Sequence, residues 1–207
     1  MFITFEGPEG SGKSTQIKLT ANWLREQGYT VIATREPGGT AIGDQIRGVL
    51  HDVANTAMVS EAEILLYSAS RAQIVGEVIR PNLANPNTII LCDRYFDSTY
   101  AYQGYGRGLD LAKLRMITEF ATGGLLPDLT LLLDIDVERG LARRVDNDEE
   151  MNRLDLEKVE FHQRVRNGYF ELMEGDARWR LVDADRPIAD VQTSIQQMIA
   201  ATAQNSL

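Results

Sequence analysis

The sequence predicts an α/β fold of the doubly wound class, in which a five-stranded parallel sheet carries helices on both faces. Five short apolar segments alternate with segments of helical periodicity along the chain. The run Thr88–Cys92 is almost wholly apolar, which is typical of a strand buried on both faces of a parallel sheet. The chain has 207 residues, 43% of them hydrophobic, and no linker-like stretch, so we expect a single domain over residues 1–207.

In the first half of the chain, the elements follow from the spacing of apolar residues and from their end signals. Ile17, Ala21 and Leu24 lie on one helical face, and Gly28 is placed to end that helix. Residues 60–63, Ser-Glu-Ala-Glu, resemble a capping box with acidic residues in the first turn. The expected elements are a strand at 1–5, a helix at 15–27, a strand at 30–33, and helices at 41–50 and 60–80.

The second half continues the alternation. Gly123 and Gly124 stop one helix, and Pro187 stands at the favoured first position of the last helix. The expected elements are strands at 88–92, 129–135 and 179–182, and helices at 111–122, 138–145, 154–174 and from 187 onward. Ligands of such folds bind at the carboxyl ends of the strands, so residues that follow a strand are the first candidates for a site.

A glycine-rich segment follows the first strand directly and matches the pattern G-x-x-x-x-G-K-[ST]. Glycines allow this backbone to turn its N–H groups toward a polyphosphate, and the next helix adds the positive end of its dipole. Lys13 can reach the β- and γ-phosphates, and the Ser14 hydroxyl can bind Mg²⁺. An unrelated glycine-rich turn would lack the strand before and the helix after. The predicted nucleotide-binding loop is Gly7, Pro8, Glu9, Gly10, Ser11, Gly12, Lys13, Ser14 and Thr15.

Asp93 and Arg94 follow the third strand. A carboxylate at this position can face the Mg²⁺ bound by Ser14, as the second acidic element of P-loop enzymes does, and Arg94 can bridge transferring phosphates. A surface pair that caps the strand is the alternative interpretation. Signalling GTPases are disfavoured, because neither Asp-x-x-Gly nor Asn-Lys-x-Asp occurs in the chain.

The composition limits the partners. A net charge of −9 argues against a nucleic-acid-binding surface, and no apolar run approaches the roughly 20 residues that span a membrane. Of the 21 basic residues, 17 are arginines, whose planar guanidinium groups suit bidentate phosphate contacts. Cys92 is the only cysteine, so no disulfide forms within the chain, and the first strand at Met1 leaves no room for a signal peptide. We therefore expect a cytoplasmic protein.

Residues 34–40, Thr-Arg-Glu-Pro-Gly-Gly-Thr, resemble the signature of bacterial thymidylate kinases. Other segments match that family in the same order over nearly the whole chain: Leu65–Arg71, Asp93–Tyr95 with Ser98 and Thr99, Ala101–Gly104, Pro127–Thr130 and Arg153–Glu157. The resemblance implies a P-loop kinase fold with a small lid at about 143–155. It also implies transfer of the γ-phosphoryl group of ATP to dTMP with Mg²⁺, giving dTDP and ADP for dTTP synthesis. It further implies a homodimer, to which apolar residues of 57–79 would contribute.

The resemblance implies roles for individual residues of the acceptor site. Glu9 would contact the 3′-hydroxyl, and Tyr67, where many members have Phe, would place its ring against thymine, although core packing is the usual role of such a residue. Arg71 lies one helical turn further and would bind a thymine carbonyl. Tyr102 would crowd the ribose 2′ position. The other implied acceptor contacts are Glu36 and Pro37 (a cis pair), Arg94 and Ser98 at the phosphate, Thr99 at the base edge, and Gln103.

The lid is expected to supply a catalytic arginine, because Gly10 stands where another branch of the family carries an arginine in the loop. Arg153 is the preferred candidate, and the Arg143–Arg144 pair, also expected near the ATP phosphates, is the alternative. An ion pair with Glu157 would be a purely structural role for Arg153. The acidic run 146–150 departs from the arginine-rich lids of the family, so we expect it to face solvent.

The expected catalytic set is therefore Glu9, Lys13, Asp93, Arg94 and Arg153, with Ser14 and Asp93 at the metal. Backbone groups near 183–187 are the implied adenine contacts. Two other functions remain open at this point. A kinase for another acceptor would prefer dAMP, dCMP or thymidine to dTMP, whereas a non-catalytic P-loop protein would bind ATP without turnover.

Overall fold

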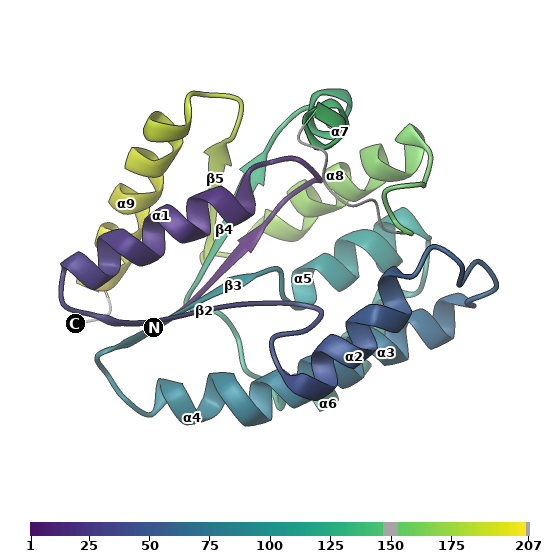
Figure 1. The fold of residues 1–207 in the computed structure, drawn as a ribbon, viewed down its shortest axis with the longest axis horizontal. Coiled ribbons are helices and arrows are strands. Elements are labelled where there is room, and N and C mark those ends of the chain that lie inside the picture. Colours follow the sequence, from purple (N-terminus) through teal and green to yellow (C-terminus); the bar gives the residue numbers. More distant parts are fainter. Residues whose placement is uncertain (147–152, 206–207) are drawn as a thin grey trace.

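A computed structural model describes residues 1–146 and 153–205 of the chain. Its described residues form one parallel sheet with the strand order β2-β3-β1-β4-β5 (Figure 1). The strands are β1 (Phe2–Glu6), β2 (Thr30–Arg35), β3 (Thr88–Asp93), β4 (Leu129–Asp134) and β5 (Trp179–Asp183). The central strand β1 pairs on one side with β3 and on the other with β4, so that Ile3 lies opposite both Leu91 and Leu129. The predicted five-stranded parallel sheet is confirmed.

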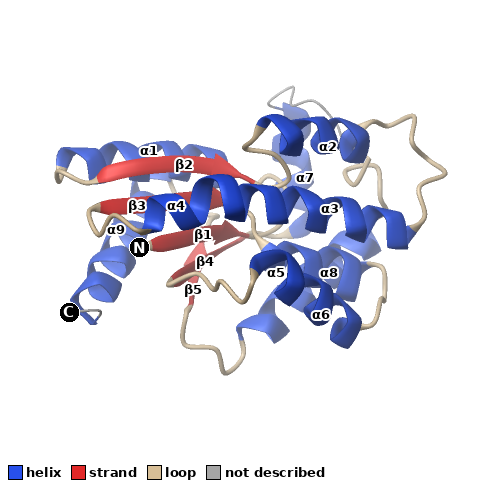
Figure 2. Cartoon of the chain, turned by 90° about the horizontal axis from the view of Figure 1, so that it is seen from below, coloured by secondary structure: helices blue, strands red, loops and turns tan. Residues whose placement is uncertain are grey.

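Helices cover both faces of this sheet. The α1 and α9 helices lie on one face, and Figure 2 shows α3 and α4 in front of the other face. The helices are α1 (Lys13–Glu26), α2 (Ala41–His51), α3 (Ser60–Ile74), the π-helix η1 (Val75–Ile79), α4 (Arg80–Leu83), α5 (Phe96–Thr99), the π-helix η2 (Tyr100–Gly106), α6 (Leu111–Thr122), α7 (Val137–Asp146), α8 (Val159–Met173) and α9 (Ile188–Asn205).

The alternation of side chains along β1 divides the core into two layers. Ile3 and Phe5 pack with α1 and α9 in one buried cluster, whereas Phe2 joins a second cluster with residues of α3 and η1. Because side chains alternate between the faces of a strand, Thr4 and Glu6 lie on the same face as Phe2. This register places a carboxylate, Glu6, beneath the loop that follows β1.

Two predicted helix starts need correction. The α3 helix begins without a capping box: Val59 is its N-cap, Ser60 makes no capping hydrogen bond, and Glu63 is buried among side chains that lie far away in the sequence. The helix predicted from residue 154 begins only at Val159. Leu154 turns into the core instead, and the buried Asp155 carboxylate lies 3.0 Å from the Arg144 guanidinium, so this segment forms a turn.

Two short helices after β3 were not predicted from the sequence. The α5 and η2 helices carry the residues that follow Asp93 around the end of the sheet, and most of η2 is buried. Gly106 lies so close to Phe161 that a Cβ atom there would be 2.7 Å from its ring. The tight contact holds η2 against α8 and fixes the direction of the side chains between 98 and 103.

Candidate active site

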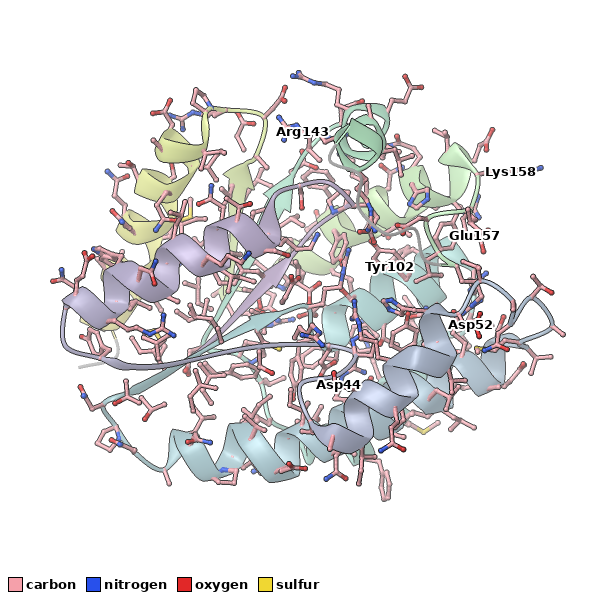
Figure 3. The ribbon with its side chains drawn as sticks, viewed as in Figure 1. Asp44, Asp52, Tyr102, Arg143, Glu157 and Lys158 are labelled. Atoms are coloured by element: carbon pink, nitrogen blue, oxygen red, sulfur yellow. The ribbon has the colours of Figure 1, made fainter. Side chains whose placement is uncertain are left out.

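A cavity of about 1010 Å³ opens at the carboxyl ends of the strands. Most residues predicted for the site line it: Glu9, Gly10, Ser11, Gly12, Lys13, Ser14, Thr15, Glu36, Pro37, Tyr67, Arg71, Asp93, Arg94, Ser98, Thr99, Tyr102, Gln103 and Arg144. Figure 3 shows Tyr102 near the middle of the molecule, between the α2 helix, which carries Asp44 and ends just before Asp52, and the end of α7. Gly7, Pro8, Arg143 and Arg153 are outside the lining.

The phosphate-binding loop has the backbone that its glycines predict. Gly10 has a φ of 68°, and a Cβ atom at this position would lie 1.9 Å from the Gly140 carbonyl oxygen of α7. Any side chain here would collide with α7, which is consistent with the absence of an arginine at residue 10. The buried Lys13 ammonium donates to the carbonyl oxygens of Gly7 (3.2 Å) and Pro8 (2.8 Å). Burial, followed by the charge of Arg94, lowers the pKa of Lys13 to about 8.

Ser14 and Asp93 meet at the ends of β1 and β3, where the sequence predicted a metal site. The Ser14 hydroxyl donates to the Asp93 carboxylate at 3.0 Å. Both are hard oxygen ligands of the kind that Mg²⁺ prefers. Within residues 1–146 and 153–205 there is no group of three or more His, Cys, Asp or Glu that could hold a metal ion. Mg²⁺ is commonly bound by one or two protein oxygens together with phosphates and water, so Ser14 and Asp93 are the two side chains here that could hold such an ion.

A buried ion pair forms the inner wall of the acceptor side. The Arg71 Nε donates to Glu36 at 2.8 Å, and Arg71 Nη2 donates to the Thr99 hydroxyl at 3.0 Å. Burial, opposed by Arg71, raises the pKa of Glu36 to about 7. Within the described residues, Arg71 Nη1 and Glu36 Oε1 are buried without a hydrogen-bond partner. A donor and an acceptor are thus left beside the cis peptide that joins Glu36 to Pro37.

Glu9 and Arg94 meet between the loop and the acceptor side. Arg94 Nη2 donates to Glu9 Oε1 at 2.8 Å, the Tyr102 hydroxyl donates to the same oxygen at 2.9 Å, and Arg144 donates to Oε2 at 3.0 Å. Although burial alone would raise it, Arg94, Lys13 and Arg144 hold the pKa of Glu9 well below its usual range. Arg94 has a φ of 66°, a strained conformation of the kind that concentrates at functional sites.

The structure separates the three lid arginines. Arg144 lies against Glu9, as described above, whereas Arg143 donates to the Ala184 carbonyl at 3.1 Å and pairs with Asp185 at 3.2 Å. Arg153 pairs with Glu63, away from the phosphate loop, and Glu157 pairs with Arg107 instead of Arg153. Residues 147–152, which contain most of the predicted acidic run and part of the predicted lid, lie outside the described residues.

Tyr67 and Gln103 reach the cavity from α3 and η2. The half-buried Tyr67 packs against the cluster of Leu154 and Phe161 and also lines the cavity, so its packing in the core does not remove the ring from the cavity wall. The Gln103 amide donates to Glu63 at 2.9 Å, and the same carboxylate accepts from Arg107 at 2.8 Å. Glu63 therefore fixes the orientation of Gln103.

The sequence did not point to one wall of the cavity. Arg35, Arg47 and His51 line it from the end of β2 and from α2, where Arg47 donates to the Pro37 carbonyl at 3.0 Å. Burial, followed by the positive charge of Arg47, lowers the pKa of His51 to about 4. Two signals were present: Arg35 ends a parallel strand, and residues 47 and 51 are one helical turn apart.

The parallel sheet carries a phosphate-binding loop after its first strand and a Ser–Asp oxygen pair beside that loop. A second compartment of the cavity is lined by arginines. These features define a P-loop phosphotransferase with an acceptor site. A family model described as thymidylate kinase matches residues 5–195. The chain belongs to the thymidylate kinase family, and the predicted family, fold class and enzyme class are confirmed.

Individual relatives agree over nearly the full length. A thymidylate kinase of Roseiflexus sp. (strain RS-1) is 52% identical over 96% of this chain and 93% of its own. One from Geotalea uraniireducens is 49% identical over 97% of this chain and 96% of its own. The crystal structure of thymidylate kinase from Ehrlichia chaffeensis superposes with a TM-score of 0.78 at 32% identity, covering 97% of this chain and 98% of that one. Among the described residues, no helix is long and apolar enough to cross a membrane.

Proposed function

We propose that the cavity binds dTMP beside the phosphate loop and that the residues around it orient the acceptor and the ATP phosphates. The chain catalyses the reaction of its family, in which the γ-phosphoryl group of ATP passes to dTMP to give dTDP and ADP for dTTP synthesis. The observation that carries the assignment of the site is the joint presence, in one cavity, of the Lys13 loop and of the free donor and acceptor on Arg71 and Glu36.

The acceptor would be oriented from three sides. Arg71 Nη1 would donate to a thymine carbonyl, and the Tyr67 ring would stack on the base. Arg94 would bind the acceptor phosphate, and Ser98, which accepts from Arg94 Nη1 at 3.2 Å, would hold its guanidinium there. Tyr102 would occupy the space that a 2′-hydroxyl needs, and Glu9 beside it would accept from the 3′-hydroxyl. The supporting contacts would be Glu36, Pro37, Thr99 and Gln103.

The donor would bind along residues 7–15, with Lys13 at the β- and γ-phosphates. Ser14 and Asp93 would hold Mg²⁺, which when bound supplies charge neutralisation at the phosphate oxygens. Arg143, with its contact to Ala184, would lie near the adenine. Phosphoryl transfer mainly needs alignment and neutralisation of charge, which these side chains provide without a covalent intermediate.

Arg144 is the better supported candidate for the catalytic lid arginine. Its guanidinium lies 3.0 Å from Glu9 inside the cavity, whereas Arg153 bonds to Glu63 outside the lining. Arg153 keeps a catalytic role only if it leaves Glu63 when the nucleotide binds. We place the lid at about 143–155 of a single kinase domain spanning 1–207.

We also infer a cytoplasmic homodimer. Three large apolar side chains are exposed on neighbouring helices: Leu65 on α3, and Met116 and Phe120 one turn apart on α6. Phe120 is 92% exposed, which is unusual for so large an apolar side chain unless a partner covers it. Sedimentation velocity of the wild type and of Phe120→Asp tests this inference: the wild type should sediment as a dimer, and the variant should shift toward the monomer.

The decisive test is a coupled ADP-release assay with ATP, Mg²⁺ and one nucleoside monophosphate at a time. We expect dTMP to be preferred over dUMP, dCMP, dAMP and the ribonucleotide of thymine. Replacement of Tyr102 by Phe should leave the preference for deoxyribose intact, since the ring remains, whereas Tyr102→Ala should weaken it. A faster rate with another monophosphate or with thymidine would show that dTMP is not the preferred acceptor. ATP binding without ADP release would support the non-catalytic alternative.

A further inference from the structure

Glu6 is a buried carboxylate beneath the active site, with no role so far. It is the last residue of β1, is fully buried, and lies one residue before the phosphate loop. Its Oε1 accepts from the backbone N–H of Tyr95 at 2.8 Å. Its Oε2 accepts from the hydroxyls of Ser98 at 2.6 Å and Tyr169 at 2.9 Å. Since an ionised carboxylate is costly to bury, these three donors indicate a specific function for it.

The same two hydroxyls also contact Arg94. Its Nη1 donates to the Ser98 oxygen at 3.2 Å and to the Tyr169 oxygen at 3.1 Å. The two hydroxyl oxygens are themselves 2.8 Å apart. Each hydroxyl has only one hydrogen, and the charged carboxylate is the strongest acceptor within reach of both. When both hydrogens point to Glu6, the lone pairs of both oxygens are left for Arg94.

We propose that Glu6 is a positioning residue that acts through Ser98 and Tyr169 to orient the Arg94 guanidinium toward the acceptor phosphate. The inference rests on the proposed role of Arg94 at the acceptor phosphate. Arg94, whose backbone has a positive φ, is then held at both ends of its guanidinium. Glu9 accepts from Nη2, while the two hydroxyls and the Gly7 carbonyl, at 3.0 Å, accept from Nη1.

The surroundings of Glu6 make its charge state sensitive to pH near neutrality. Burial raises the pKa of Glu6 to about 7, and the neighbouring Asp97 carboxylate adds to the increase, whereas Arg94 opposes it. Lys13 and the buried Cys92 thiol also interact with it electrostatically. The remaining groups that face it are the Tyr95 amide and the hydroxyls of Ser98 and Tyr169. A protonated Glu6 would donate to one hydroxyl, so that hydrogen bond would reverse and Arg94 would lose a well-oriented acceptor.

The first experiment compares Glu6→Gln with a matched control, Thr4→Val. Thr4 lies two residues earlier on the same face of β1, is equally buried, and hydrogen bonds with Thr130 at 2.9 Å, so its variant loses a buried hydrogen bond without affecting Arg94. Supporting groups of this kind typically change activity by about 10–100-fold. We expect Glu6→Gln to lower kcat by at least about tenfold with the KM for ATP unchanged within about twofold, and Thr4→Val to keep kcat.

Tyr169→Phe is the second variant and retains the packing of the ring. It should lower kcat in the same way, and Glu6→Gln should have a smaller effect in the Tyr169→Phe background than in the wild type, since both act through one path. The kcat of the wild type should fall as the pH decreases through about 7, and Glu6→Gln should lack that step. Strictly additive effects, or an equal loss in Thr4→Val, would overturn the inference.

Arg94→Ala separates this inference from the function on which it rests. If that variant keeps the wild-type rate, the proposed role of Arg94 is wrong and Glu6 has nothing to position. If Arg94→Ala is inactive but both Glu6→Gln and Tyr169→Phe retain kcat, only the role of Glu6 is rejected.

Discussion

The acceptor and donor sides of the cavity are organised in opposite ways. On the acceptor side, the side chains of Arg71 and Glu36 are only 2% and 3% exposed and bond to each other within the core. On the proposed donor side, beyond the lining of the cavity, the α7 side chains of Arg139 and Arg143 are 60% and 37% exposed and share one partner, Asp185. The fold thus holds the Arg71–Glu36 wall rigidly inside the core, whereas the two α7 arginines remain accessible to solvent.

The difference has an energetic meaning. Breaking a buried ion pair on one side costs several kcal/mol, because the remaining charge stays buried, whereas exposed pairs typically contribute about 0–1 kcal/mol. We therefore expect substitutions on the acceptor side to change stability as well as activity. Substitutions on the donor side should change activity alone. Comparing the free energy of unfolding with the kinetic constants of each variant therefore shows which side a residue belongs to.

The largest effect is expected for Arg71→Gln, which leaves the Glu36 carboxylate buried without its cation. The free energy of unfolding, measured with urea, should fall by about 3–5 kcal/mol, and the KM for dTMP should rise. The double variant with Glu36→Gln serves as the control and should recover part of the stability, since no buried charge remains. An unchanged urea midpoint in the single variant would show that the acceptor wall is not held by this pair.

Lys13→Ala and Arg94→Ala should each lower kcat/KM at least 10²-fold, which corresponds to about 2.7 kcal/mol of transition-state stabilisation. In the proposed site, both cations would meet the phosphates at the boundary between the two compartments. Steady-state kinetics provides the measurement, and Lys18→Ala, which removes an exposed lysine from the same helix α1, is the matched control. A folded variant with near-wild-type rates would remove that residue from the mechanism.

His51 should give the wall formed by α2 a distinct pH dependence. Its pKa is lowered from 6.5 to about 4 in the folded protein by burial and by Arg47, so the folded state binds fewer protons than the unfolded state between these values. The stability that neutral His51 contributes is present above pH 6.5 and is lost as the pH falls toward 4. By pH 5 the loss relative to His51→Gln should be on the order of 1–2 kcal/mol.

Thermal unfolding of both proteins from pH 7 to pH 4.5 measures this difference. The raised pKa values of Glu6 and Glu36 act in the opposite direction over the same range, but they are common to both proteins and cancel in the comparison. Parallel curves for the wild type and His51→Gln would show that the imidazole titrates normally.

The smallest effect on stability is expected for Arg143→Ala, at about 0.2–1 kcal/mol and less at high salt, because its ion pair with Asp185 is exposed. Arg144→Ala should instead lower kcat, and by more than Arg153→Ala does. Denaturation in low and high salt, together with kinetics of the three variants, separates these roles. A larger loss of kcat in Arg153→Ala would return the catalytic role to that residue.

Local patterns in the sequence sufficed for the sheet and the phosphate loop, because buried parallel strands and loop glycines leave signals within a few residues. The α5 and η2 helices leave no such local signal and were therefore not predicted. A π-helix that includes Gly104 and Gly106 has neither the 3.6-residue period nor the composition of an ordinary helix.

The missed partners within the site depend on contacts between distant residues. Glu63 looked like part of a capping box, yet its partners Gln103 and Arg107 are 40 and 44 residues away in the sequence. Arg153 had the residue type and motif position of a lid arginine, but only the fold shows that its side chain points to Glu63. Resemblance thus predicted which residues line the cavity better than it predicted the partners of the arginines.

Glu9 has a consequence for how the site treats anions. Because this carboxylate already pairs with both Arg94 and Arg144, a phosphate that reaches these arginines replaces one anion with another. The free energy of phosphate binding is then the difference between the arginine–phosphate and the arginine–carboxylate contacts. It depends on how well the tetrahedral phosphate fits the arginines compared with the planar carboxylate of Glu9. The arginine cluster consequently selects among anions by their shape, and a spherical ion such as chloride gains little from its positive charge.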